Sequence, residues 1–499
     1  MNDLLEKGAF ELAKLIRDKN ISPVEVVRTH IERIQEVNGV INAVVADRFE
    51  QALQEAKEIE QAISRGNHLG LLAGVPITVK ESIALKDFPF TSGSLFRKGD
   101  IATEDAESIK RLKREGAIIL GKTNVPECNF WMESYNKVYG ITRNPYDPGR
   151  TPGGSSGGEG AIIGAGGVPF GVGSDIAGSI RMPAAFCGIF GHRPTSSLIS
   201  IKGHAFCKKR DLTNIDSSKI RKNLAIGPMC RQAEDLYPLL KIMSGAQVDN
   251  DDCQKYLNAQ IDDWSNYTFY LCPAPDIQYT SHPDKEIINA VTEAGKIFNS
   301  HGARIKTLDS KLFYHAFAIW QSSLTDATDY SLNEEFGNGD KLSITKEILL
   351  RLAGKSRLTM PGLMMLLGER LMGRSRSDVL KCIHEGEKVA ERLDLILNDK
   401  ALIIMPVFPR VAPQNYHSLL RPLDWNYTTI FSAIDFPACS APFGFNKDNI
   451  PLSIQIVGNR NQDYLILMAA KFIEKIKGGW KIPHISNNEK TAMGKPARL

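Results

Sequence analysis

The residues of this chain that could do chemistry gather in one glycine-dense stretch. Thirteen of the 39 residues from Gly153 to Gly191 are glycine, against 41 in the 499 residues of the whole chain. Within it, Gly153-Gly154-Ser155-Ser156-Gly157 matches GxSxG, the turn that exposes a nucleophilic serine in α/β hydrolases. That interpretation needs an Asp and then a His farther along the chain, and no candidate stands in an informative context. The pattern points to serine chemistry without identifying its partners.

A second segment matches a phosphate-binding pattern, but its context argues against that function. Gly116-Ala117-Ile118-Ile119-Leu120-Gly121-Lys122-Thr123 fits GxxxxGK[ST] at every position. A phosphate-binding loop follows a strand and precedes a helix, so that backbone N–H groups surround the anion. Here a predicted helix comes first and the four variable positions read as an apolar strand. We interpret the match as accidental and expect a structural role for Lys122, the rival candidate for a catalytic base.

Longer blocks around the serines carry a resemblance to a known family. The two most specific are GGSSGGEG, from Gly153 to Gly160, and GSDIAGSIRMPA, from Gly173 to Ala184. Others are Pro76 to Glu81, Gly121 to Asn124, Gly191 to Thr195 and Gly227 to Met229. With these blocks, which span about residues 70 to 245, the chain closely resembles the amidase signature family and, within it, the fatty-acid amide hydrolases. Weaker similarity covers the N-terminal helices and Arg421 to Gly458.

The resemblance implies a Ser-Ser-Lys triad. Matched by motif, Ser179 is the nucleophile that forms the acyl ester, Ser155 relays the proton and Lys80 is the base. The family holds the relay serine after a cis peptide, here Gly154 to Ser155. Lysine acts as a base only when its amine is neutral. Lys80 follows an apolar run, and burial there would disfavour its charged ammonium form and so lower its pKa. Ser155 would then pass a proton from the attacking serine and return one to the leaving nitrogen.

The turn before the nucleophile supplies the expected oxyanion hole. The backbone N–H groups expected to bind the charged intermediate are those of Ile176, Ala177, Gly178 and Ser179. Most family members have glycine where this chain has Ala177, so we expect its methyl group to narrow the choice of acyl group. Asp175 and Arg181 are expected to hold the turn through hydrogen bonds and an ion pair. Ser156 is expected to support Ser155 without transferring protons.

The resemblance predicts hydrolysis of carboxylic amides, foremost fatty-acid amides to fatty acid plus amine, with no metal or cofactor; esters stay open as substrates. One alternative is the amidase subunit of a tRNA-dependent amidotransferase, which needs an ammonia tunnel and protein partners. Another is a catalytically idle, lipid-binding member of the family. Retention of Lys80, Ser155 and Ser179 argues against an idle protein. Acyl length, leaving amine and oligomeric state, a homodimer included, stay open.

The elements that must position these residues alternate between strand and helix. Predicted buried strands are Pro76 to Lys80, Ala117 to Leu120, Leu402 to Pro406 and Leu452 to Val457. Predicted helices begin at Ser22-Pro23, which resembles a capping box, and run over Thr103 to Glu115, Cys230 to Met243 and Asp284 to Phe298. Together with the resemblance, this predicts an α/β amidase signature fold, a central mixed twisted β-sheet surrounded by α-helices. We expect a single domain over residues 1–480, a loop from Lys202 to Lys222 and a polar tail over 481–499.

Composition bears on location and partners. The 61 Lys and Arg and 57 Asp and Glu leave a net charge of +4, too weak a basic excess for a nucleic-acid-binding protein. The longest stretch without a charged residue, Gly160 to Ser174, is shorter than the roughly 20 residues of a transmembrane helix. The N-terminus lacks the features of a secretory signal, and the 8 scattered Cys fit reduced thiols. We expect an intracellular protein, cytoplasmic or peripheral on an internal membrane.

Two more segments bear on location. Met360 to Leu367 is apolar and has basic neighbours at Arg351, Lys355, Arg357, Arg370 and Arg374. It fits an interfacial helix that makes peripheral contact with a membrane, with an ordinary core helix as the alternative. The terminal Ala497-Arg498-Leu499 resembles peroxisomal signals of the S-K-L type and makes that organelle an alternative location.

Overall fold

An 11-stranded mixed sheet runs through the computed structural model, which describes residues 3–67, 69–206, 215–247, 249–328, 331–371 and 373–485. The strand order is β1-β3-β2-β6-β8-β7-β12-β13-β11-β9-β10. The strands are β1 (Val44–Asp47), β2 (Pro76–Lys80), β3 (Ile118–Thr123), β6 (Phe170–Asp175), β7 (Phe190–Arg193), β8 (Ala225–Cys230), β9 (Thr268–Leu271), β10 (Arg304–Thr307), β11 (Ala401–Met405), β12 (Ala438–Phe445) and β13 (Pro451–Val457); a separate hairpin pairs β4 (Tyr135–Asn136) with β5 (Gly140–Ile141).

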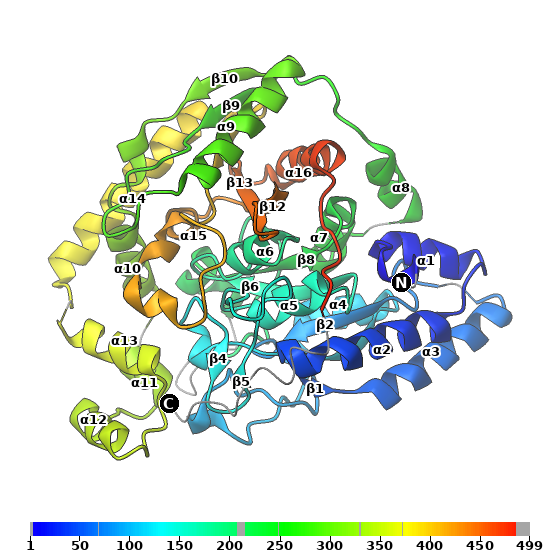
Figure 1. Ribbon diagram of the computed structural model, residues 1–499, viewed down its shortest axis with the longest axis horizontal. Coiled ribbons are helices and arrows are strands. Elements are labelled where there is room, and N and C mark those ends of the chain that lie inside the picture. The colour runs from blue at the N-terminus through cyan, green and yellow to red at the C-terminus, as the bar shows by residue number, and fades with distance from the viewer. Residues whose placement is uncertain are drawn as a thin grey trace.

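Helices surround this sheet (Figure 1). They are α1 (Ala9–Arg17), α2 (Pro23–Ile41), α3 (Phe49–Ser64), α4 (Glu107–Arg114), α5 (Gly157–Gly164), α6 (Arg181–Phe186), α7 (Leu236–Ser244), α8 (Asn250–Asn258), α9 (Lys285–Ser300), α10 (Ala316–Ala327), α11 (Leu332–Phe336), α12 (Ile344–Leu352), α13 (Met360–Leu371), α14 (Arg376–Ile396), α15 (Thr429–Ala433) and α16 (Asp463–Lys477). The predicted fold class, a mixed sheet surrounded by helices, is confirmed.

Register explains why distant sequence blocks meet at one place. Strand β2 lies between β3 and β6 and is parallel to both, with Val79 opposite Val172. Parallel neighbours have their carboxyl ends at the same edge of the sheet. Lys80, the last residue of β2, and the turn that follows Asp175, the last residue of β6, therefore lie side by side. All five residues of β2 are buried, as expected for a strand covered on both faces.

Two predicted helices differ from the structure, for identifiable reasons. Cys230 belongs to β8, where it pairs with Phe170, so the helix predicted from Cys230 begins only at Leu236. The helix predicted from Thr103 begins at Glu107, because Ala106 has a non-helical backbone with ψ of 151° and its N–H donates to the Ala84 carbonyl. At the start of α2, Ser22 caps the helix by accepting from the N–H groups of Val24 and Glu25.

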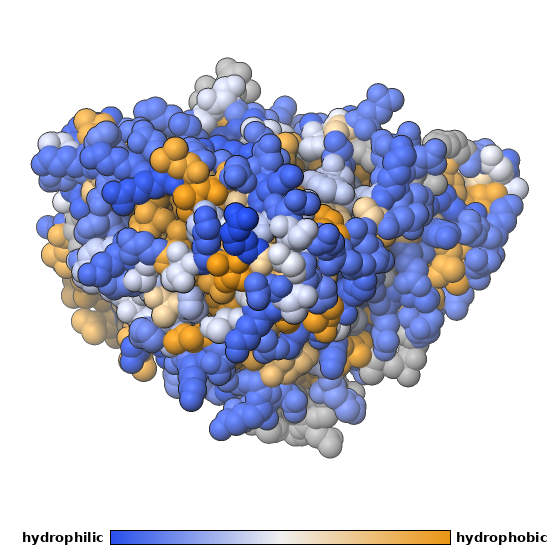
Figure 2. All heavy atoms as spheres, turned by 90° about the horizontal axis from the view of Figure 1, so that it is seen from above, coloured by the Kyte–Doolittle hydropathy of each residue, from blue (hydrophilic) through white to orange (hydrophobic). Residues whose placement is uncertain are grey.

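The sheet takes strands from the first part of the chain to the last. The single domain over residues 1–480 stays a prediction. No described helix is long and apolar enough to cross a membrane. The face in Figure 2 is mostly hydrophilic, with hydrophobic side chains in small groups, as on other folded surfaces. Helices α11 to α13 lie together at one end of the molecule (Figure 1).

Two segments singled out in the sequence lie partly or wholly outside the described residues. In the predicted loop from Lys202 to Lys222, residues 207–214 are not described, and short 3-10 turns occupy Ile215–Ser217 and Lys219–Lys222. The predicted tail is described only to residue 485, so the Ala497-Arg498-Leu499 signal lies outside the structure's description.

Candidate active site

Lys80 and Ser155 form the centre of the candidate site. Lys80 Nζ lies 2.6 Å from Ser155 Oγ, and both side chains are buried. The lysine arrives at the end of β2, whereas Ser155 stands in the turn before α5 and follows a cis peptide from Gly154. Two further contacts of Lys80 Nζ are with Ser174, at 2.9 Å to Oγ and 3.4 Å to the carbonyl oxygen. The amine is therefore surrounded by neutral hydrogen-bonding groups.

The environment of Lys80 favours its neutral form. Burial lowers the pKa of this amine to about 7, against an opposing effect of the Asp175 and Glu159 carboxylates. Glu159 lies on α5 and accepts hydrogen bonds from Thr78 Oγ1 at 2.7 Å and Thr123 Oγ1 at 2.8 Å. Burial raises the pKa of Glu159 to about 7, which weakens its charge beside the lysine. A lysine with a pKa near 7 can accept a proton at neutral pH.

The backbone links Ser179, the predicted nucleophile, to the turn of Ser155, the predicted relay. The Ser156 N–H donates to the Ser179 carbonyl at 3.1 Å, which joins the turn carrying Ser155 to the turn carrying Ser179. Ser156 Oγ also donates to the Ser174 carbonyl at 3.2 Å and accepts from its N–H at 3.3 Å. Ser156 is thus bonded to the backbone of Ser179 through its N–H and to the backbone of Ser174 through its hydroxyl. This arrangement suits the supporting role expected from the sequence.

One expected oxyanion donor has another partner. The Gly178 N–H donates to Asp175 Oδ1 at 2.6 Å and is unavailable to a substrate in this structure. Gly178 is therefore removed from the expected set of four donors, and Ile176, Ala177 and Ser179 stay predicted donors. Gly178 is required for a different reason. Its φ is +119°, and a Cβ there would lie 2.1 Å from Thr428 Oγ1.

A buried ion pair anchors the same turn. Arg181 donates to Asp175 through Nε at 3.0 Å and Nη2 at 2.9 Å, and neither side chain is exposed. Burial alone would raise the pKa of Asp175, but Arg181, together with Arg193 and the Gly178 N–H, lowers the value to about 2. Arg181 also donates to the Thr428 carbonyl and to Gln455 Oε1. The pair links the turn to β13 and to the segment before α15.

Lys122, the rival base, is placed away from the serines. Its Nζ donates to the Ile83 carbonyl, and the amine lies 5.8 Å from the centre of the Phe90 ring. Burial lowers the pKa of Lys122 to about 8, so its basicity resembles that of Lys80. Position, not basicity, separates the two lysines. The predicted structural role fits this geometry, and the segment that matched a phosphate loop contains β3.

Four residues that the sequence analysis missed lie around Lys80 and the turn before Ser179. Ser174 contacts Lys80, and His204 Nε2 lies 2.9 Å from Ser174 Oγ. Trp320 Nε1 donates to the Ile176 carbonyl at 2.7 Å, and Thr428 Oγ1 donates to the Ala177 carbonyl at 2.5 Å. Ser174 sat inside a recognised block, so its place could have been suspected. His204 and Trp320 lie outside the blocks that carried the resemblance, and Thr428 lies in the stretch of weaker similarity from Arg421 to Gly458.

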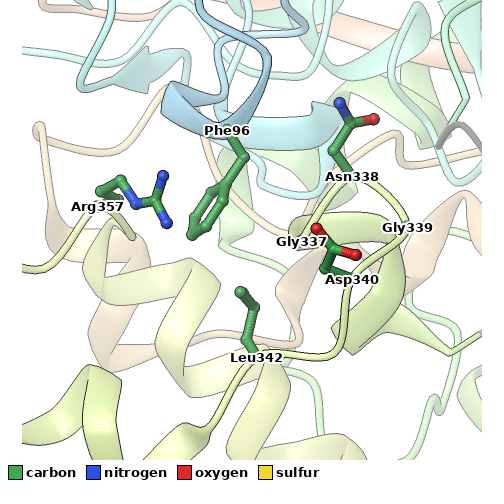
Figure 3. Close-up of a pocket in the computed structure, with 7 residues that line it drawn as sticks. All are labelled: Phe96, Gly337, Asn338, Gly339, Asp340, Leu342 and Arg357. Atoms are coloured by element: carbon green, nitrogen blue, oxygen red, sulfur yellow. The ribbon is translucent and has the colours of Figure 1, made fainter.

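A separate cavity lies beside helices α11 to α13. It measures about 510 Å³ and is lined by Phe96, Gly337, Asn338, Gly339, Asp340, Leu342 and Arg357 (Figure 3). The Arg357 guanidinium faces the Phe96 ring at 3.8 Å from its centre. None of Lys80, Ser155 and Ser179 lines it, so we assign this cavity no part in the chemistry of the site.

Comparison with known proteins bears on the family and the fold. The Amidase family model matches residues 25–467. The chain is 35% identical over 497 residues to fatty-acid amide hydrolase 2-B of Danio rerio, an alignment that covers 97% of this chain and 92% of the relative. It is 28% identical over 494 residues to a glutamyl-tRNA(Gln) amidotransferase subunit of Lachnospira eligens, covering 95% and 99%. The solved structure of 6-aminohexanoate cyclic dimer hydrolase superposes with a TM-score of 0.76 at 25% identity, covering 95% of this chain and 98% of that one.

Proposed function

Because this chain belongs to the amidase family and is an amide-hydrolysing enzyme, we propose that it cleaves fatty-acid amides with a Ser179, Ser155 and Lys80 triad. The observation that carries the proposal is the 2.6 Å hydrogen bond between Lys80 Nζ and Ser155 Oγ in a fully buried setting. A buried amine with a pKa of about 7 is a base at neutral pH, and its nearest hydroxyl is the relay serine.

Acylation follows from this arrangement. Ser179 Oγ attacks the amide carbon while its proton moves to Ser155 Oγ, whose own proton moves to Lys80 Nζ. The negative charge that forms on the carbonyl oxygen is bound by backbone N–H groups of the turn. When the carbon–nitrogen bond breaks, Ser155 donates a proton to the leaving nitrogen and regains one from Lys80. Water then repeats the sequence on the acyl ester and releases the acid.

The substrate class rests on the relatives. The relative named fatty-acid amide hydrolase is 35% identical, against 28% for the amidotransferase relative, with similar coverage of this chain. The proposal therefore takes a long-chain amide as substrate and water as acceptor. An amidotransferase would release ammonia from glutamine for a partner protein, and this activity is the second candidate function.

Labelling with a fluorophosphonate tests the nucleophile. We expect one label per chain on Ser179, none after Ser179→Ala, and loss of turnover after Lys80→Met. Lys122→Met is the matched control, because it removes another buried amine, one that donates to the Ile83 carbonyl and bonds no serine among the described residues. Labelling that persists in Ser179→Ala, or that falls on Ser156, contradicts the assignment. Turnover of a primary fatty amide, a fatty ethanolamide, a short amide and glutamine measures the substrate class; activity on glutamine alone would favour the amidotransferase.

Membrane contact is a second part of the proposal. The predicted apolar segment forms α13, but its Leu363 and Leu366 are buried, so only part of it can meet lipid. The exposed apolar side chains of α12 and α13 are Ile348, Leu349, Leu352, Met360, Met364 and Leu371. Exposed basic side chains accompany them at Lys346, Lys355, Arg357, Arg370 and Arg374. We infer peripheral attachment to an anionic internal membrane through this surface, called the α12–α13 surface below.

A further inference from the structure

The base of the triad has a fixed set of hydrogen-bond partners. Besides Ser155 Oγ, Lys80 Nζ contacts only Ser174 among the described residues, through its hydroxyl and its carbonyl oxygen. Ser174 Oγ is in turn 2.9 Å from His204 Nε2. All four side chains are buried, and the most exposed, His204, shows 6% of its surface. Which of these groups donates and which accepts decides where the lone pair of a neutral lysine can point.

The histidine tautomer follows from its second contact. His204 Nδ1 lies 3.0 Å from the Ala205 carbonyl oxygen, which can only accept, so Nδ1 carries the proton. Burial, with a further effect of Lys80, lowers the pKa of His204 to about 3, so the ring is neutral. Nε2 is then an acceptor without a proton. Ser174, which has one hydroxyl proton, must donate it to His204.

The direction of that bond constrains the lysine. Because the Ser174 proton is committed to His204, Ser174 Oγ can only accept from Lys80, and so can the Ser174 carbonyl. A neutral amine has two N–H bonds and one lone pair. Its two N–H bonds are drawn to Ser174, and the lone pair is left facing Ser155 Oγ, the one neighbour with a proton to give.

We propose that His204, acting through Ser174, is a positioning residue that aims the lone pair of neutral Lys80 at Ser155 and prevents Ser174 from donating to the base. The inference rests on the proposed role of Lys80. The backbone on either side of His204 is held against the chain that follows β2: the Ala205 N–H donates to the Ser82 carbonyl at 2.8 Å, and the Ala84 N–H donates to the Gly203 carbonyl at 2.8 Å. His204 is therefore held against the segment that directly follows Lys80, the base.

Other charged groups that influence Lys80 stay in place in every variant below. Asp175 at the end of β6 and Glu159 on α5 both favour the protonated amine. Lys122 on β3 lowers the pKa of the Glu159 carboxyl, as Lys80 itself does. None of these contacts His204 through a hydrogen bond in the described part of the chain. A change in the pH profile after replacing His204 then reports on the contact through Ser174.

The test compares His204→Met with His204→Gln, using a chromogenic fatty anilide over pH 5.5 to about 10. Methionine fills similar space but cannot fix the Ser174 proton, so that hydroxyl can turn and donate to neutral Lys80. We expect kcat on the alkaline plateau to fall about 10- to 100-fold, KM to stay unchanged and the apparent pKa of kcat/KM to move down, because a donor now stabilises the neutral amine. Glutamine can accept from Ser174 and should restore most of the activity and the original profile.

Ser174→Ala and the double variant with His204→Met provide an independent measurement. If His204 acts through Ser174, replacing it should change kcat less than twofold once the hydroxyl is gone. Losses that multiply, a wild-type profile in His204→Met, or an equal loss in His204→Gln would overturn the inference. So would an apparent pKa that moves up, the sign of water entering a loosened site. If wild type itself shows no rise with pH, or Lys80→Met stays active, the proposed function fails instead.

Discussion

Trp320 Nε1 lies 2.7 Å from the carbonyl oxygen of Ile176, so a side chain of α10 fixes a peptide of the turn that precedes the candidate nucleophile. In a planar trans peptide the C=O and the following N–H point in opposite directions. Trp320 therefore directs the N–H of Ala177 away from itself. Thr428, bonded to the next carbonyl, directs the N–H of Gly178 toward Asp175.

Trp320→Phe should lower kcat about tenfold and leave KM nearly unchanged, because it removes the donor that orients the Ala177 N–H, a predicted oxyanion donor, but keeps an aromatic ring in place. Steady-state kinetics on a fatty anilide measure this. Trp425→Phe is the matched control, since the Trp425 indole packs on Trp320 but donates to the Pro422 carbonyl. An equal loss in the two variants would mean that packing, not the hydrogen bond, matters.

Activity should follow the fraction of Lys80 that is deprotonated. With burial lowering the pKa of this amine to about 7, kcat/KM should rise about tenfold per pH unit below pH 7 and level off above pH 8. Buffers of constant ionic strength from pH 5 to 10 give the profile. His204, whose pKa burial lowers to about 3, does not titrate in that range. A bell centred on pH 6 would contradict a lysine base.

The same lysine should make stability rise with pH. Lys80 binds a proton up to pH 10 in the unfolded chain but loses it near pH 7 when folded, so the unfolded state binds more protons between these values. The free energy of unfolding contributed by this group therefore increases from pH 7 to pH 10. Lys80→Met lacks this effect. Its melting temperature should exceed that of wild type at pH 7, by a margin that shrinks toward pH 10.

Gly178→Ala should abolish activity and lower the free energy of unfolding by about 1–3 kcal/mol, since φ is +119° and the new Cβ would meet Thr428 Oγ1. Chemical denaturation and anilide turnover test this. Ala177→Gly removes one methyl group at the neighbouring position, whereas Gly178→Ala adds one. It should keep its turnover and accept bulkier acyl groups, and a loss as severe as that of Gly178→Ala would contradict the distinction.

Replacing Leu349, Leu352 and Leu371 by serine should reduce co-flotation with anionic liposomes several-fold and leave turnover of a soluble short anilide unchanged. Their side chains are 62%, 81% and 81% exposed on the α12–α13 surface, so the change removes contacts with lipid and not with the core. Leu395→Ser on α14, 85% exposed, is the matched control. Leu363→Glu is unsuitable, because that side chain is buried and its loss would damage packing. Unchanged flotation of the triple variant would exclude this surface.

Local patterns in the sequence were enough to predict most of what lies near the glycine-dense stretch. The apolar run before Lys80 predicted a buried strand, and β2 has those bounds, because a strand buried on both faces needs an uninterrupted apolar run. The blocks around Ser155 and Ser179 indicated the fold, since their spacing belongs to one family. The limits of the helix at Cys230 were wrong because cross-strand pairing with Phe170 outweighed local periodicity.

The sequence by itself determined the residue types: a lysine after an apolar strand, serines in glycine turns and an acid and arginine around one of them. The tertiary structure alone decided which groups face them. Gly178 lost its predicted role because its N–H meets Asp175, and His204, Trp320 and Thr428 gained theirs across 30, 144 and 251 residues of chain. A hydrogen bond needs its two groups within about 3 Å of each other. The number of residues between two groups along the chain does not predict that distance, because the sheet brings together strands that are far apart in the sequence.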